Sequence, residues 1–466
     1  MSPSPKPLIP IVIILLLVPI LLLLGLNLLL QTPPIKEGIR TTLSSTLGMP
    51  ISFGWLSATL SGGIKVADIS GEHKESNTRF ASKSILMAPD YLRLIHGEIV
   101  IHDLRINHPV VHSTLVQAVT SPAPSSEPPT GSSQTNLTLS NSLQQTVQPP
   151  SHTTPPSPMP LQAQALLSQI PRLTITDAEL TLLNAQNLPL VTIEEMSLQG
   201  NTTSKNSWQG TLKVHRMTIG RGLILHELTS PIILSPGIST LSLDALSAKM
   251  GGGMLAGQFA LALLPTAPQY KAHLTLTGAS LNQFLLDASL GNIASEGAIT
   301  GELQLSGIAG DASSMNGDGN LLCTDAVIQP ADFLRQIGQI LSIQELQMLH
   351  LAEGKAVFTI HGGTTQITQL FLRSQNLILA AQGPVKPNGD LDLQARLLFN
   401  ENLTGRLRGI LGPQLSQAPE AGYSQVSFRV YGQPQSPKTD LLERLTGIHF
   451  GGNLGGLLQG LFGHPR

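Results

Sequence analysis

The stretch FTIHGGTTQITQLFLRSQNLILAAQG, residues 358–383, shows the pattern that decides the fold of this 466-residue chain. Apolar and polar residues alternate within it, and the alternating runs close at Gly362 and Gly383. An alternation with a period of two places apolar side chains on one face of a β-strand and polar side chains on the other. Because glycine adopts the backbone angles that a tight turn needs, we expect a turn after each run.

The same signature recurs on both sides of this stretch. It reads MSLQG at residues 196–200, LTLTG at 274–278, LQLSG at 303–307 and FRVYG at 428–432. The copies have no fixed spacing, which argues against the repeat architectures that have a strict period. The sequence therefore predicts a mainly β fold with a few helices, built as a long antiparallel meander with one apolar face.

Further strands and a few helices are predicted around this meander. We expect helices where apolar residues recur every three or four positions, as Phe333, Leu334, Ile337 and Leu341 do. Pro330 before that stripe and Asp332 in its first turn favour a helix start. The predicted strands cover residues 51–53, 63–69, 80–87, 97–106, 173–175, 180–183 and 191–198, and the predicted helices cover residues 35–47, 161–169, 281–290 and 331–345.

Residues 8–30, LIPIVIILLLVPILLLLGLNLLL, contain no charged side chain. About 20 apolar residues suffice to cross the hydrocarbon core of a bilayer, so we predict an N-terminal transmembrane helix. A cleavable signal peptide is the alternative, but its apolar region spans only roughly 7–15 residues and a small-residue cleavage site follows it. Lys6 before the run and Lys36 and Arg40 after it give no clear orientation.

Composition limits the functional classes. The formal charge is −2, so a nucleic-acid partner is not expected. Charged residues make up 12% of the chain, about half of the ~25% usual for soluble domains. Either the apolar N-terminal run lowers this share, or some aliphatic surface faces something other than a protein core. The single cysteine, Cys323, allows no internal disulfide bond.

Changes in composition divide the chain into five segments. A stretch rich in Pro, Ser and Thr reads as a disordered linker or an exposed insertion, because it cannot bury enough apolar area to fold. A Gly- and Leu-rich tail follows the last strand. The predicted segments are a membrane anchor at residues 1–34, a first helix with β segment at 35–117, the linker at 118–160, the β-rich body at 161–440 and the tail at 441–466.

No motif of a known catalytic, metal or cofactor site stands out. Neither an HExxH run nor a GxSxG run occurs, and no glycine cluster is followed by the Lys-Ser/Thr of a phosphate-binding loop. Asp311, Asn316 and Asp318 lack the bidentate glutamate of a calcium loop and read as a polar turn. We therefore predict no catalytic residues, no metal, no cofactor and no enzymatic activity.

Two stretches near the N-terminus read GMPISFGWLSATLSGGIKVADIS and LIHGEIVIHDLRINHPVV. Near the C-terminus the chain reads LLCTDAVIQPADFLRQIGQIL and VSFRVYGQPQSPKTD, with a closing element from Gly432 to Pro437. With these stretches, both ends of the chain resemble the AsmA-like family. The chain departs from the family by its linker and its short length. The resemblance implies an N-terminal membrane helix followed by an elongated, curved β-sheet. It further implies a bacterial inner-membrane protein with its body in the periplasm, and a part in lipid transport between membranes or in outer-membrane assembly.

These observations give two functional hypotheses. In the first, the apolar face of the sheet holds lipid acyl chains, which need a trough free of unpaired charge. The candidate lining residues are Leu274, Leu276, Leu303, Leu305, Phe358, Ile360, Leu391 and Leu393. In the second, the apolar face is ordinary core and the protein is an envelope scaffold that binds another protein, for instance by strand addition at a sheet edge.

Overall fold

The computed structural model describes most of the β-rich body together with the segment that leads into it. Its described residues include none from 1 to 26, from 115 to 170 or beyond 446, so the predicted linker and most of the predicted membrane helix and tail lie outside them. In the described part, no helix combines the length and the apolar character needed to cross a bilayer. The described residues are 27–28, 30–47, 49–59, 63–73, 77–89, 101–114, 171–184, 186–203, 207–220, 222–235, 240–262, 268–288, 294–411, 414–434 and 436–446.

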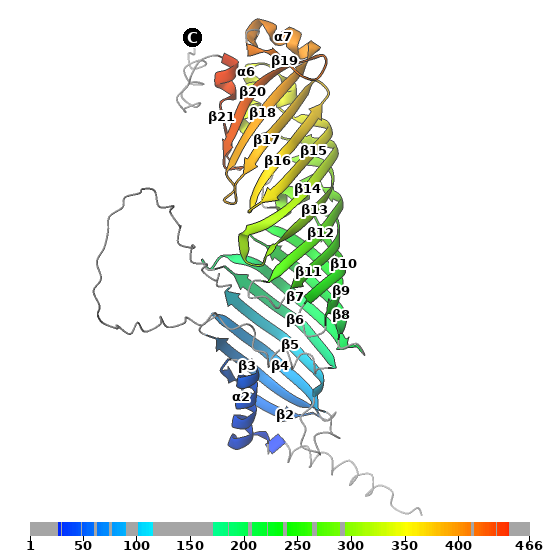
Figure 1. Ribbon diagram of the computed structural model, residues 1–466, viewed down its shortest axis with the longest axis vertical. Coiled ribbons are helices and arrows are strands. Elements are labelled where there is room, and N and C mark those ends of the chain that lie inside the picture. The colour runs from blue at the N-terminus through cyan, green and yellow to red at the C-terminus, as the bar shows by residue number, and fades with distance from the viewer. Residues whose placement is uncertain are drawn as a thin grey trace, which may run out of the picture.

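In the described residues one sheet of 21 strands forms the body, and it is elongated and curved (Figure 1). Strands that follow one another in sequence pair with one another from β3 to β18, and β18 then pairs with β20. The strands are β1 (Ile51–Ser52), β2 (Trp55–Ala58), β3 (Ile64–His73), β4 (Thr78–Pro89), β5 (Ile101–Thr114), β6 (Arg172–Leu183), β7 (Pro189–Thr202), β8 (Trp208–Ile219), β9 (Leu223–Leu234), β10 (Thr240–Met250), β11 (Gly253–Ala262), β12 (Gln269–Ser280), β13 (Ser295–Ile308), β14 (Asp311–Ile328), β15 (Leu349–His361), β16 (Thr364–Ser374), β17 (Leu377–Val385), β18 (Leu391–Asn400), β19 (Ser416–Gln417), β20 (Tyr423–Gly432) and β21 (Lys438–Thr439).

The described helices are short, and they lie at the ends of the body or between strands. They are α2 (Pro33–Leu47), α5 (Leu281–Asp287), α6 (Asp332–Ile340), the 3₁₀ turn η2 (Gln344–Leu346), α7 (Glu401–Leu411) and α8 (Leu441–Thr446). The predicted helix at residues 331–345 is thus shorter than expected, because Ser342 adopts a left-handed φ of 53° that ends it before η2. Figure 1 places α2 at one end of the body and α7 at the other.

The antiparallel meander has one exception, which the sequence did not predict. Strands β5 and β6 pair in parallel, with Ile106 opposite Ile175 and Val111 opposite Leu180. All the other strand pairs are antiparallel in the described part of the chain. The chain between β5 and β6 must return to the edge at which β5 began, which explains why a long connection, residues 115–171, separates them in sequence.

A series of β-bulges bends the N-terminal half of the sheet. Of the six non-glycine strand residues with left-handed φ angles near +50°, five lie there: Asp68, His108, Asp177, Glu195 and Glu227; the sixth, Asp325, lies in β14. His108 and Asp177 are neighbours across β5 and β6, with 2.8 Å between Nδ1 and Oδ2. A bulge bends its strand and shifts the side-chain alternation by one residue.

This geometry corrects one sequence prediction. Residues 173–175 and 180–183 were expected as two strands flanking Asp177 and Ala178, but β6 runs unbroken from Arg172 to Leu183. The pairing with β7 shifts on either side of Ala178, which is buried. Asp177 therefore marks a bulge within one strand, because an aspartate tolerates the left-handed conformation that ends the simple alternation.

The predicted role of the recurring glycines also needs correction. Gly362 lies in the β15–β16 turn and Gly432 ends β20, as expected. Gly200, however, lies inside β7, where a Cβ atom would come within 2.5 Å of the Trp208 ring. Gly383 lies inside β17, where a Cβ would come within 2.3 Å of the carbonyl oxygen of Asp392. These glycines give room to a neighbouring ring or strand instead of making a turn.

We predict that Glu195→Val destabilises the protein by about 1 kcal/mol, because a β-branched side chain is poorly tolerated at left-handed φ. The control is Gln199→Val in the same strand, an exposed position outside the bulge, where valine suits an extended backbone. Urea midpoints of the two variants provide the comparison. Equal midpoints would show that the backbone at Glu195 carries no such constraint.

Candidate functional site

The eight predicted lining residues all lie on one face of the sheet, which we call the inner face. Residues paired across antiparallel strands share a face. One row of such pairs links Leu274 to Leu303, Leu303 to Gly319 and Gly319 to Phe358. A second row links Leu305 through Gly317 to Ile360, and Ile360 through Thr365 and Val385 to Leu391. Leu276 and Leu393 lie two residues from Leu274 and Leu391, on the same side of their strands.

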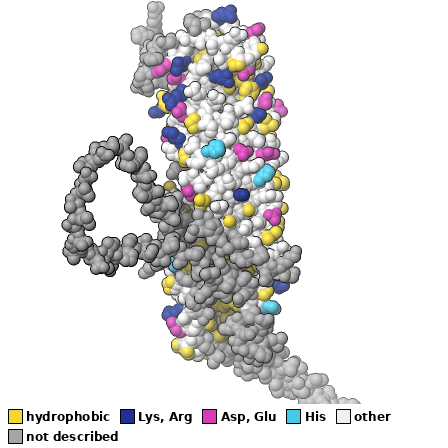
Figure 2. All heavy atoms as spheres, in the orientation of Figure 1, with side chains coloured by type: hydrophobic (Ala, Val, Ile, Leu, Met, Phe, Trp, Pro, Cys, Tyr) yellow, Lys and Arg dark blue, Asp and Glu magenta, His cyan; other side chains and the backbone are white. Residues whose placement is uncertain are grey.

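The inner face carries no charge over strands β12 to β18. The register places the Lys, Arg, Asp, Glu and His residues of these strands on the opposite, outer face, apart from Asp311 in the β13–β14 turn. On the outer face, charged groups pair with one another. Arg429 holds the Asp392 carboxylate at 2.7 Å and lowers its pKa, and Lys249 does the same for Glu227. Figure 2 shows acidic, basic and histidine side chains scattered over one side of the molecule.

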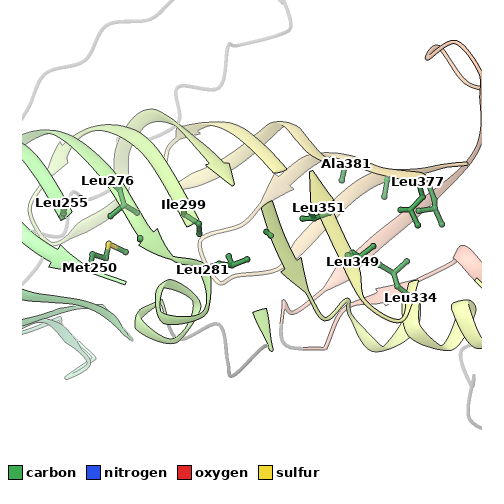
Figure 3. Close-up of a cluster of buried hydrophobic side chains, with 14 of the residues drawn as sticks. Met250, Leu255, Leu276, Leu281, Ile299, Leu334, Leu349, Leu351, Leu377 and Ala381 are labelled. Atoms are coloured by element: carbon green, nitrogen blue, oxygen red, sulfur yellow. The ribbon is translucent and has the colours of Figure 1, made fainter. Parts of the chain in front are cut away.

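One edge of the inner face is closed by helices, and we call it the helix edge. The connections from β12 to β13, from β14 to β15 and from β18 towards β20 all leave at this edge, and they contain α5, α6 and α7. Leu281 of α5, Leu334 of α6 and Leu403 of α7 join the same buried cluster as inner-face residues of the strands. Figure 3 shows Leu281 and Leu334 together with strand residues such as Ile299 and Leu349 in this cluster.

Polar contacts hold these helices in place. The buried carboxylate of Asp287 in α5 accepts a hydrogen bond of 2.9 Å from the backbone N–H of Gly251 in the β10–β11 turn. Asn376, in the β16–β17 turn, donates to Glu345 of η2 at 2.6 Å and accepts from Asn400 at 2.9 Å. Asn400 also accepts from the N–H of Leu403, which caps the start of α7. The helices therefore cover the inner face at the helix edge, and these hydrogen bonds hold them in place.

The opposite edge, which we call the turn edge, has only tight connections between strands β13 and β18. Gly310, Gly362 and Gly363 supply left-handed residues to two of them. In β13 the burial of inner-face residues falls toward this edge, since Ile299 and Gly301 are buried and Leu303 and Leu305 are half-buried, whereas in β15 Ile360 is buried beside the same edge. We call the half-buried apolar residues on this side the turn-side strip: Phe259, Leu274, Leu303, Leu305, Phe358 and Leu391.

The main buried cluster includes Leu276 and contacts Leu274, but it stops short of the other six predicted lining residues. Among those six, Ile360 and Leu393 are buried, and Leu303, Leu305, Phe358 and Leu391 are half-buried. Gly317 and Gly319 lie between them, and Phe358 covers Gly319 so closely that a Cβ would come within 2.6 Å of its ring. The alternation in the sequence thus identified residues of the inner face, but it did not show which of them pack into the main buried cluster.

The pKa values of two titratable groups also indicate that the inner face is apolar. Burial raises the pKa of the Cys323 thiol and of the Tyr270 phenol above their ordinary values. Cys323 lies opposite Ile299 and Gly354, and Tyr270 stacks on Phe259 with 6.4 Å between ring centroids. Both groups are more easily kept neutral than ionised at these positions.

A hollow of about 420 Å³ lies over strands β10 to β14. Its lining combines outer-face residues such as Lys271, His273 and Asp318 with Phe259 and Leu305 of the turn-side strip. The charged side chains of Lys271 and Asp318 do not suit an acyl chain. The described residues contain no group of three or more side chains that could hold a metal ion. The candidate site is therefore the inner face, and above all its turn-side strip.

We predict that Cys323 reacts slowly with iodoacetamide near pH 8. The thiolate is the reactive form, and a raised pKa lowers the fraction of thiolate at any given pH near 8. The reaction rate of the folded chain should therefore begin to rise at a higher pH than the rate of the unfolded chain. Rates measured from pH 7 to pH 10, with and without urea, test this directly, since Cys323 is the single cysteine. Superimposable pH profiles would contradict an apolar environment at this thiol.

Comparisons with protein-family models, with curated proteins and with solved structures found no significant match to this chain. The resemblance to the AsmA-like family therefore stays a prediction from the residues quoted above. The inner face is therefore the feature of the molecule from which a function can be inferred, since these comparisons supply no site or activity.

Proposed function

We propose that the inner face holds lipid acyl chains and that the protein handles or transfers lipid in the bacterial envelope without catalysing a reaction. The observation that carries this proposal is the turn-side strip, an uncharged apolar surface that continues across neighbouring strands and is only half-buried. Together with the AsmA-like resemblance, residues 8–30 would anchor the body to the inner membrane, with the body in the periplasm. A part in outer-membrane assembly would follow from the same lipid handling.

The dimensions of the inner face suit this role. Strands β12 to β18 are seven strands, and neighbouring strands lie roughly 4.8 Å apart, so the uncharged face is roughly 29 Å wide. Half of the hydrocarbon core of a bilayer, which one acyl chain spans, is roughly 15 Å. An extended acyl chain therefore fits across the strands without reaching a charged residue.

The energetics point the same way. Each methylene group moved from water to an apolar surface contributes roughly 0.8 kcal/mol, so even a partly covered chain gains several kcal/mol along the strip. A single unpaired carboxylate in the path would cost a comparable amount. The absence of charge from the inner face of β12 to β18 is thus what an acyl-chain site requires, and the closed helix edge restricts entry to the turn edge.

We predict that Leu305→Asp abolishes acyl-chain contact with the body, because it places a charge in the turn-side strip. The full chain would be reconstituted in phospholipid vesicles containing a lipid with a photoreactive diazirine in its acyl chain. After illumination, mass spectrometry would map the crosslinked peptides. The wild-type chain should crosslink within strands β12 to β18, and the Leu305→Asp variant should lose these crosslinks.

The matched control is Gln304→Asp, the neighbouring residue on the outer face, which should keep the crosslinks. Circular dichroism and urea midpoints would establish that both variants are folded. Crosslinks confined to residues 8–30, with none in the body of the wild-type chain, would contradict acyl-chain binding. The envelope scaffold, in which the inner face is ordinary core, would then be the better hypothesis.

A further inference from the structure

The N-terminal edge of the sheet is held to the segment that precedes it by two side-chain amides. Asn27 accepts a hydrogen bond of 2.6 Å from the backbone N–H of Ala58, and Gln31 donates to the carbonyl oxygen of Leu56. Both backbone groups belong to β2, which pairs with β3 on its other side. The two amides thus satisfy groups that an edge strand leaves free.

This contact fixes where the preceding sequence leaves the body. Leu30 is buried in a cluster with Leu56 and Val66, so the segment is attached by apolar packing as well as by hydrogen bonds. The residues directly before Asn27, from 8 to 26, are uncharged and almost entirely apolar. Asn27 and Leu30 belong to the C-terminal end of the membrane helix predicted at residues 8–30, so this predicted helix ends against the body.

Beside this attachment point the protein exposes large apolar side chains. Leu28 is 68% exposed, and Trp55, the first residue of β2, is 59% exposed. The ammonium group of Lys36 lies 6.0 Å from the centroid of the Trp55 ring, within range of a cation–π interaction. Trp55 is one of two tryptophans in the chain, and the other, Trp208, is buried in the core.

We infer that Leu28, Trp55 and Lys36 form a docking surface for the headgroup layer of a phospholipid membrane. Tryptophan is enriched at the membrane–water interface, where its ring is partly buried and its N–H stays hydrated. A lysine beside it reaches the phosphate groups while its methylene stem stays near the apolar layer. The end of the sheet nearest the predicted anchor would then lie directly against the bilayer.

This inference rests on the proposed membrane anchor and adds a defined contact to it. An alternative occupant is a protein partner that covers Trp55. The sequence directly before Asn27 favours the membrane, because residues 8–26 contain no charged side chain and lead straight to this surface. The distinction can be measured, because the two tryptophans occupy such different environments.

The test uses the full chain with Trp208→Phe, in which Trp55 is the single fluorophore. It is reconstituted in vesicles of phosphatidylcholine and phosphatidylglycerol that carry a nitroxide quencher either near the headgroup or deep in the acyl chain. We expect the shallow quencher to reduce Trp55 emission more strongly than the deep one. The reciprocal variant Trp55→Phe, which reports on Trp208, should respond to neither, because that ring lies inside the body.

A second pair of variants tests the role of the lysine. Lys36→Glu, in the Trp208→Phe background, should weaken the shallow quenching, whereas Lys355→Glu on the outer face of β15 should leave it unchanged. If Trp55 is not quenched although the chain floats with the vesicles, the docking surface is wrong and the anchor stands. If the chain does not float with the vesicles at all, both the membrane anchor and the docking surface are wrong.

Discussion

The constraint on which this structure depends is that a sheet with one apolar face must cover that face. Sandwiches do so with a second sheet, and α/β folds do so with rows of helices. Here the described part of the chain provides only short helices, of which α5, α6 and α7 lie along one edge of this face. The inner face is consequently buried near α5, α6 and α7 and only half-buried near the turn edge. An apolar surface left in this state is unusual for a protein core and typical of a surface with an apolar partner.

The bulges and the glycines shape the face that the helices leave open. Left-handed residues distort five strands, β3, β5, β6, β7 and β9, which curves the N-terminal half of the sheet; they are Asp68, His108, Asp177, Glu195 and Glu227. Gly317 and Gly319 remove side chains from the inner face beside Leu305 and Phe358. The left-handed residues set the curvature, and the two glycines leave space between the large apolar residues. A lipid acyl chain, which is narrow and flexible, suits such a surface better than a folded partner does.

The two ends of the body differ in what they offer to a membrane. At the N-terminal end, Leu28 and Trp55 are exposed beside Lys36, and Asn27 and Gln31 join the apolar run to the edge strand β2. At the C-terminal end, the described apolar residues of α7 and α8, such as Leu407 and Leu441, are buried. The proposed contact with the membrane is therefore at the N-terminal end, where the predicted anchor and the sheet meet.

The amino-acid sequence by itself determined the mainly β fold and, within each strand, which residues share a face, as Leu274 and Leu276 do and as Leu391 and Leu393 do. These properties depend on alternation between neighbours in the chain, which the sequence displays directly. It could not show that Asp177 lies in a bulge within one strand, that Gly200 lies under Trp208, or that β5 and β6 pair in parallel, because each depends on a partner strand. It also showed Asn27 and Gln31 only as polar interruptions of an apolar run. Only the tertiary structure placed them on the free edge of β2 and put the helices on one edge, since edges and register exist only once strands have paired.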